Sequence, residues 1–213
     1  MRINYQKELD KILEELERTG KVPRLLLHSC CAPCSSYVLE YLSKYFRITV
    51  FYYNPNIWPE EEYGKRVEEQ RRFAGELQTR YPVSFVEGRY EKERFYEMAR
   101  GLENVREGGE RCFRCYRLRL EETARRAAEG GFDYFTTTLS ISPMKNAQKL
   151  NETGLGLAEI YQVPYLVSDF KKKDGYRRSV ELSREYGLYR QDYCGCIYSK
   201  RERENLYRES PSV

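Results

Sequence analysis

Short apolar segments alternate with longer amphipathic segments along most of this sequence, and this alternation restricts the fold more than any other feature. Five of the short segments have the β-branched and aromatic residues and the flanking turns that are typical of strands. They cover residues 24–29, 47–56, 83–88, 132–140 and 163–170. Strands that alternate with helices form a parallel sheet with helices on both faces, joined by right-handed crossovers. We therefore predict an α/β fold with a mostly parallel, five-stranded sheet.

The composition indicates one globular domain. The chain has 213 residues, of which 40% are hydrophobic, which is enough for one full-sized core. We predict an N-terminal helix over residues 1–20, a sheet domain with two cysteine clusters over 21–170, and a basic, cysteine-rich helical segment over 171–213 that packs on the same domain. No apolar run approaches the length of a membrane span, and the charged start is not a signal peptide. These features predict a cytoplasmic protein with no membrane partner.

Seven cysteines are the residues that point most directly to chemistry. They form three clusters: Cys30, Cys31 and Cys34, then Cys112 and Cys115, then Cys194 and Cys196. A reducing compartment disfavours disulfides and favours metal-binding or catalytic roles for such thiols. A C-x-x-C pair on a helical turn projects both sulfurs to one side, as a metal site requires. Two pairs from remote parts of the chain would complete a four-thiolate site for zinc or for an iron–sulfur cluster.

The third cluster allows two interpretations, because a single glycine separates Cys194 from Cys196. A disulfide between them would close a very small, strained ring, which suits a redox-active pair better than a structural bond. The same sulfurs can instead ligate a second metal, with Cys34 or the carboxylate of Asp169 as a further ligand. The residues alone leave both options open.

Other polar residues lie at the predicted strand ends, where parallel sheets bind their ligands. Ser142 follows the fourth predicted strand, and Asp169 lies at the end of the fifth. His28, the only histidine, precedes the first thiol cluster, and we predict that it is a packed structural residue. The net charge is only +4, but cations concentrate in the second half of the chain, as a solvated surface or as a phosphate-binding surface.

The motifs HSCCAPCS, GGERCFRCYRLR, FTTTLSISP, SDFKKKDGYRRS and YRQDYCGCIYSKRER extend from about Leu25 to Lys200. Together they resemble the epoxyqueuosine reductases of the QueH family. The resemblance implies reduction of the epoxide of epoxyqueuosine, at the wobble position of tRNA, to the cyclopentenediol of queuosine. It also implies a 4Fe-4S cluster and no cobalamin. The predicted sheet is Rossmann-like and resembles that of the adenine-nucleotide hydrolase-like group.

This reaction implies two redox or metal centres, because it takes two electrons whereas one 4Fe-4S cluster normally passes them singly. Our hypothesis assigns Cys30, Cys31, Cys112 and Cys115 to the cluster. It assigns Cys194 and Cys196 to the second, catalytic centre, either as a dithiol store or as ligands of a mononuclear iron. Cys34 and Asp169 are the leading further candidates there. An external electron donor is required, and the sequence leaves that donor and the oligomeric state open.

The implied substrate accounts for the basic segments. Cations would hold the anticodon stem-loop by phosphate contacts while a splayed base enters the crevice. The predicted substrate-binding residues are Lys171, Lys172, Arg177, Arg178 and Ser142, and Tyr116 and Tyr193 are candidates to stack on the base.

Two alternatives belong to other functional classes. The first is a zinc-stabilised RNA-binding protein without catalysis, which predicts a colourless protein that holds zinc alone. The second is an ATP-dependent tRNA thiolase with an iron–sulfur cluster. A thiolase needs a phosphate-binding loop after the first strand, and the bulky HSCCAPC segment lacks the glycines for it.

Overall fold

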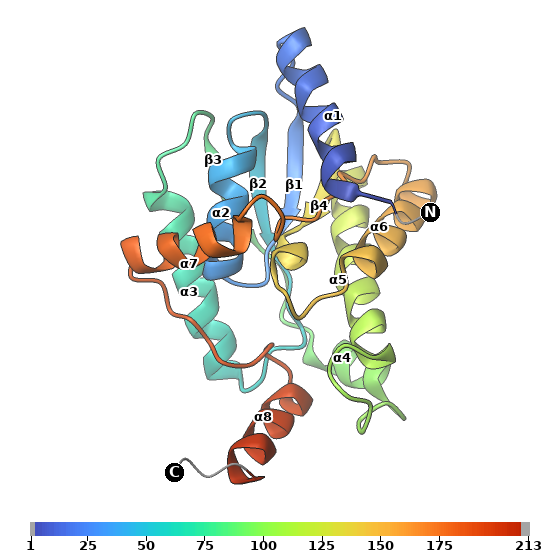
Figure 1. Cartoon of the computed structure of the whole chain (residues 1–213). Helices are drawn as coiled ribbons and strands as arrows, with labels where there is room; N and C mark the ends of the chain where they lie inside the picture. Colours follow the sequence, from blue (N-terminus) through green and yellow to red (C-terminus); the bar gives the residue numbers. More distant parts are fainter. Residues whose placement is uncertain (1–2, 210–213) are drawn as a thin grey trace.

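A four-stranded parallel sheet lies at the centre of the computed structural model, which describes residues 3–209 of the chain (Figure 1). Its strands are β1 (Arg24–His28), β2 (Arg47–Tyr52), β3 (Val83–Glu87) and β4 (Tyr134–Thr137). They lie in the order β3-β2-β1-β4, and every neighbouring pair is parallel. The predicted α/β class and the parallel sheet are therefore confirmed.

The fifth predicted strand, residues 163–170, is wrong. Only Tyr165 in this segment forms a bridge, to Phe135 of β4, so no ladder runs along it. β4 ends at Thr137, where the chain turns into the short 3-10 helix η1 (Thr138–Ile141). The segment 163–170 therefore has no neighbouring strand of its own length to pair with. The hydroxyl of Thr136 also donates a hydrogen bond to the carbonyl of Leu166 at 2.7 Å, in place of a backbone donor.

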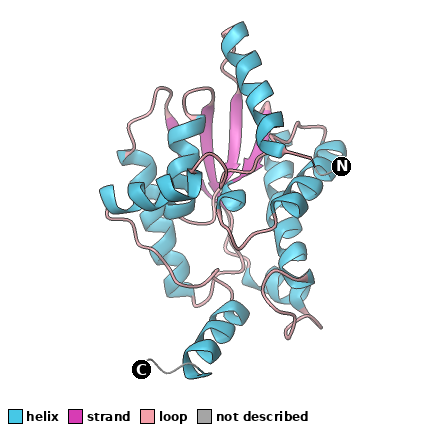
Figure 2. Cartoon of the chain, in the orientation of Figure 1, coloured by secondary structure: helices cyan, strands magenta, loops and turns pink. Residues whose placement is uncertain are grey.

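Helices cover both faces of the sheet (Figure 2). The helices of the described residues are α1 (Tyr5–Thr19), α2 (Ala32–Leu42), α3 (Glu60–Glu76), α4 (Lys92–Ala99), α5 (Glu110–Glu129), α6 (Ala147–Tyr161), α7 (Gly175–Glu185) and α8 (Ile197–Glu209), of which α8 lies away from the sheet (Figure 1). α2, α3 and α7 lie on one side, and α4, α5 and α6 lie on the other (Figure 1). No helix within residues 3–209 is both long and apolar enough to cross a membrane. The first two and last four residues of the predicted terminal segments lie outside the described residues.

β1 separates the two main hydrophobic clusters. Leu25 and Leu27 pack in the cluster that includes Leu39 of α2, whereas Leu26 packs in the cluster that includes Leu120 of α5. Alternate side chains of a strand point to opposite faces, so β1 is buried on both sides. Burying one such leucine stabilises the fold by about 1.5–3 kcal/mol. This packing fixes the end of β1, from which the first cysteine cluster extends.

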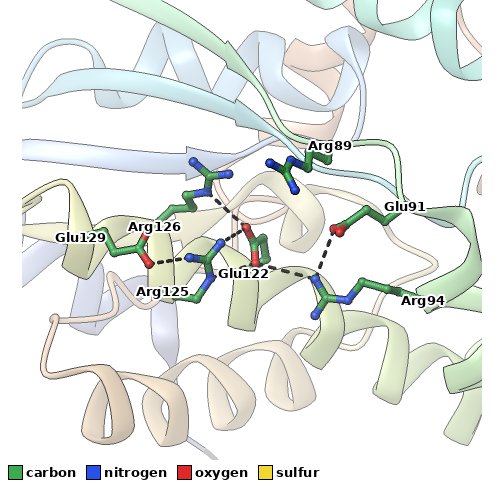
Figure 3. Close-up of a pocket in the computed structure, with 7 residues that line it drawn as sticks. All are labelled: Arg89, Glu91, Arg94, Glu122, Arg125, Arg126 and Glu129. Carbon is green, nitrogen blue, oxygen red and sulfur yellow. Dashed lines mark hydrogen bonds and ion pairs between the residues drawn. The ribbon is translucent and has the colours of Figure 1, made fainter.

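A pocket of about 330 Å³ lies between α5 and the segment that leads into α4, and the described side chains that line it are all charged (Figure 3). The carboxylate of Glu122 accepts hydrogen bonds from Arg125 and Arg126, and Arg94 pairs with both Glu122 and Glu91. Burial raises the pKa of Glu122, but the hydrogen bonds from Arg125 and Arg126 outweigh it and lower the pKa. None of the residues given for this pocket also lines a cavity that contains cysteines. We interpret the pocket as an ion-pair network that joins α4 to α5.

His28 ends β1 and is completely buried. Its Nδ1 pairs with the hydroxyl of Thr137 at 2.8 Å, and its Nε2 pairs with the carbonyl of Tyr53 at 3.1 Å. Burial, together with the charge of Arg119, lowers the pKa of His28 to about 3. His28 therefore joins three strand ends as a neutral side chain, in agreement with the predicted structural role.

We expect this histidine to make the protein less stable as the pH falls. The unfolded chain protonates His28 near pH 6.5, whereas the folded protein resists protonation until about pH 3. The stability that depends on His28 is therefore complete above pH 6.5 and is lost below it, by about 2 kcal/mol between pH 7.5 and pH 5. Urea unfolding at both pH values checks this for the wild type and for His28→Gln, which lacks the titrating group. An equal loss of stability in both proteins would contradict the prediction.

Candidate metal centre

The first cysteine cluster lies where the strand order reverses. β1 has β2 on one side and β4 on the other, so the chain connections diverge at the carboxyl ends of β1 and β4. Cys30 and Cys31 follow β1, and Cys34 lies in the first turn of α2. Their three Sγ atoms lie within 4.8 Å of one another, and those of Cys30 and Cys31 are 3.8 Å apart. This group, the triad, can bind a metal ion.

Neighbouring residues hold the triad in place. The backbone N–H of Cys30 donates to the hydroxyl of Thr138 in η1 at 3.4 Å, and the side-chain amide of Asn54 donates to the carbonyl of Ser29 at 2.8 Å. Hydrogen bonds from the Cys30 and Cys34 thiols, and then the charge of Arg66, lower the pKa of Cys31. Cys31 is therefore the thiol of the triad that ionises most readily.

The other four cysteines line one small cavity, and we call them the quartet. Cys112 and Cys115 lie on the buried face of α5, as their helical spacing predicts, whereas Cys194 and Cys196 come from the loop before α8. Burial raises the pKa of Cys115 to about 11 and the pKa of Cys196 to about 12. Thiols that ionise with such difficulty become ligands when a bound cation stabilises the thiolates.

Gly195 positions the two cysteines beside it. Its φ of +128° lies in a region that other residues rarely adopt, and an added Cβ would lie 3.0 Å from the side chain of Ile57. The backbone N–H of Trp58 donates to the Gly195 carbonyl at 2.8 Å, and Arg66 donates to the carbonyl of Cys194 at 3.3 Å. The segment between β2 and α3, together with α3 itself, thus fixes this loop beside α5.

A larger cavity of about 630 Å³ adjoins the triad. All three triad cysteines line it, and so does Ser142, a predicted substrate-binding residue. Cys194, Arg119 and Lys145 line both this cavity and the small one, so the two spaces adjoin. Other lining residues include the apolar and aromatic side chains Met144, Tyr176, Tyr193 and Leu206 and the cations Arg106, Arg190 and Arg203.

Two buried cations of this site, Arg119 and Lys145, were not among the residues predicted from the sequence. Lys145 Nζ lies 3.0 Å from Cys194 Sγ and 2.7 Å from a carboxylate oxygen of Glu107. Arg119 lies in α5 and is 1% exposed. The sequence does indicate the position of Arg119. It follows Cys115 by four residues, so the two side chains lie on the same face of a helix. Lys145 lies in an irregular segment that gives no such signal.

Five predicted site residues do not line either cavity, namely Asp169, Lys171, Lys172, Arg177 and Arg178. Asp169 forms an ion pair with Lys171 at 2.7 Å. Arg177 pairs with Asp174 at 3.0 Å, and Arg178 pairs with Glu40 at 2.7 Å. The tyrosines predicted to stack on a base are both at the site: Tyr116 lines the small cavity and Tyr193 lines the large one.

Comparison with known proteins connects this site to one family. Residues 25–202 match the family model described as Epoxyqueuosine reductase QueH. The chain is 46% identical over 202 residues to Epoxyqueuosine reductase QueH of Staphylococcus epidermidis, and the match covers 93% of this chain and 85% of that relative. It is 37% identical over 190 residues to Epoxyqueuosine reductase QueH of Thermotoga maritima, with coverage of 87% and 94%. The matched range contains all seven cysteines, and the chain belongs to the epoxyqueuosine reductase QueH family of oxidoreductases.

Proposed function

We propose that this chain reduces the epoxide of epoxyqueuosine in tRNA to the alkene of queuosine, without cobalamin. The observation that carries the proposal is the gathering of seven free thiols around two adjoining cavities, in a chain of this family. The reaction breaks both C–O bonds of the epoxide, takes up two electrons and two protons, and releases the oxygen as water. An external donor supplies the electrons.

The thiols fit an iron–sulfur cluster and a second metal ion. Four cysteine thiolates hold a 4Fe-4S cluster, and the quartet offers four thiols around one space. The triad suits a single metal ion. Tetrahedral metal–sulfur bonds of about 2.3 Å place the sulfurs around one ion about 3.8 Å apart. The Cys30 and Cys31 sulfurs have this separation, 3.8 Å. When bound, such centres pass electrons to the substrate one at a time.

We therefore propose that the quartet holds the cluster and that the triad holds a mononuclear iron. The assignment made from the sequence took Cys30 and Cys31 as cluster ligands and gave Cys194 and Cys196 to the second centre. That assignment draws ligands for the cluster from both groups, whereas the geometry supports one group for each centre. Asp169 pairs with Lys171 away from both cavities, and the proposal gives it no role.

The protein's own residues bind and orient the substrate. The large cavity, about 630 Å³, has the size of small-ligand pockets, and Tyr176 and Tyr193 offer rings against which a splayed base can stack. Ser142 offers a hydroxyl in the same cavity. Lys145 lines both cavities, so its ammonium is available to donate a hydrogen bond to the epoxide oxygen as negative charge develops there.

Cations near the large cavity are the proposed contacts to tRNA phosphates. Arg106 and Arg190 line the cavity itself. The predicted cations of the segment 171–178 serve as contacts to the outer part of the anticodon stem-loop, because Tyr176 from this segment also lines the cavity. When tRNA binds there, its phosphates replace the carboxylate partners of these cations, such as Glu40, which pairs with Arg178.

A turnover assay on anaerobically purified protein tests the proposal. The substrate is tRNA that carries epoxyqueuosine, dithionite supplies the electrons, and mass spectrometry identifies the nucleosides after digestion. We expect a brown protein with iron and acid-labile sulfide that converts the nucleoside into one lighter by one oxygen atom. Metal-free protein is the control and should give no conversion. A colourless protein with stoichiometric zinc and no conversion would refute the proposal in favour of the RNA-binding alternative.

A further inference from the structure

Four cations are buried around the thiols, although buried cations are rare in proteins unless they are paired. They are Arg66, Arg111, Arg119 and Lys145, and each is at most 8% exposed. Three of them have a carboxylate partner within the fold. The pairs are Arg66–Glu62 at 2.7 Å, Arg111–Glu202 at 3.0 Å and Lys145–Glu107 at 2.7 Å. Among the side chains that the structure describes, Arg119 has no carboxylate partner.

The hydrogen-bond partners of the Arg119 side chain are neutral groups. Its Nε donates a hydrogen bond to the carbonyl of Cys115 at 3.3 Å, and its Nη1 donates to the side-chain oxygen of Asn54 at 3.4 Å. Asn54 in turn holds the triad loop through the carbonyl of Ser29. Arg119 lines both cavities and therefore lies between the triad and the quartet.

A fully buried guanidinium without an anionic partner is strongly unfavourable, because neutral hydrogen bonds do not replace the water that a charge loses. Metal-bound cysteines are thiolates, and a cluster held by four of them is a net anion. Arg119 thus has the position and the charge that such an anion requires.

We infer that Arg119 is the buried counter-charge of the iron–sulfur cluster held by the quartet and that it raises the reduction potential of this cluster. This inference rests on the proposed function and adds a residue that acts through the metal rather than on the substrate. Each electron that enters the centre adds negative charge within reach of a fixed positive charge in a medium that screens poorly. Arg119 stabilises the reduced state more than the oxidised state, so its removal makes reduction harder.

The test compares three variants of the full chain, each purified anaerobically with its metal bound. Arg119→Gln removes the charge, Arg119→Lys keeps it, and Arg117→Gln is the matched control. Arg117 lies on the same helix with its side chain 54% exposed, and it pairs with Glu121 at 3.8 Å. Iron and sulfide are counted, and a redox titration followed by visible absorption gives the midpoint potential without any substrate.

We expect Arg119→Gln to retain iron and to shift the midpoint potential to a more negative value. Arg119→Lys should lie closer to the wild type, and Arg117→Gln should match it. An unchanged potential in an iron-loaded Arg119→Gln overturns the inference. If Arg119→Gln loses its iron, retention of iron by Arg119→Lys supports the charge role, and loss of iron from both variants overturns it. Wild-type protein that holds iron but fails to convert epoxyqueuosine would refute the proposed function and leave the shift in potential intact.

Discussion

Cys196→Ser is expected to remove the iron–sulfur cluster and to lower the turnover of epoxyqueuosine in tRNA by more than about 100-fold, since even substitution of a residue that only hydrogen-bonds to a metal ligand costs roughly 10- to 100-fold. The Cys196 thiol is buried against Phe95 and lines the small cavity with the other quartet cysteines. Serine keeps the volume nearly unchanged but offers iron a hard hydroxyl in place of a thiolate. Iron and sulfide counts, the visible spectrum and a single-turnover assay measure the effect.

The matched control is Cys34→Ser in the triad. If the quartet holds the cluster, the Cys34→Ser protein keeps the cluster iron and all of the sulfide. It loses the single metal ion of the triad and, with it, the turnover of epoxyqueuosine. A clear contradiction would be a Cys196→Ser protein with an intact cluster beside a Cys30→Ser protein without one. That result would restore the assignment of Cys30, Cys31, Cys112 and Cys115 to the cluster.

Lys145→Met is expected to lower turnover by about 100- to 1,000-fold, the usual cost of removing one donor to a developing oxyanion. The Lys145 ammonium is 3.0 Å from Cys194 Sγ and 2.7 Å from Glu107, and it lines both cavities. Methionine has a similar length and shape but cannot donate a hydrogen bond or carry a charge. Single-turnover rates at saturating tRNA separate this loss from weaker substrate binding.

Lys149→Met serves as the control, because Lys149 is 49% exposed on α6 and pairs with Glu152 at the surface. It should retain wild-type turnover. Iron must be counted in the Lys145→Met protein as well, since loss of the metal would show that Lys145 supports the thiols rather than the substrate. Turnover of an iron-loaded Lys145→Met within a few-fold of the wild type would also contradict the proposed role.

Hydrophobic patterning was enough to predict β1 to β4 and the helices around them, because each strand carries its own apolar run. The fifth strand failed because a strand also needs a partner of matching length. The hydroxyl of Thr137 accepts a hydrogen bond from the N–H of Leu139 at 3.2 Å, which starts η1 and ends β4. This local capping by one threonine decides the extent of the sheet, and strand propensity does not encode it.

The candidate site was predictable in composition but not in grouping. Helical spacing places Cys112 and Cys115 on one face, and the end of β1 places Cys30 and Cys31 in a loop. Nothing in the local sequence indicates that Cys194 and Cys196 reach the Cys112 pair. Their approach depends on long-range contacts, such as the hydrogen bond from Trp58 to Gly195 and the one from Arg66 to Cys194.

The division of the quartet between α5 and the loop before α8 also fixes when the site can be loaded during biosynthesis. Cys112 and Cys115 leave the ribosome long before Cys194 and Cys196, and at usual rates the intervening chain takes roughly 4 to 16 seconds to make. During that interval α5 carries two thiols without their partners. Under the proposed assignment of the quartet to the cluster, cluster insertion follows translation of the Cys194–Cys196 loop, and a ribosome that stalls between the two segments leaves a nascent chain without two of the proposed ligands.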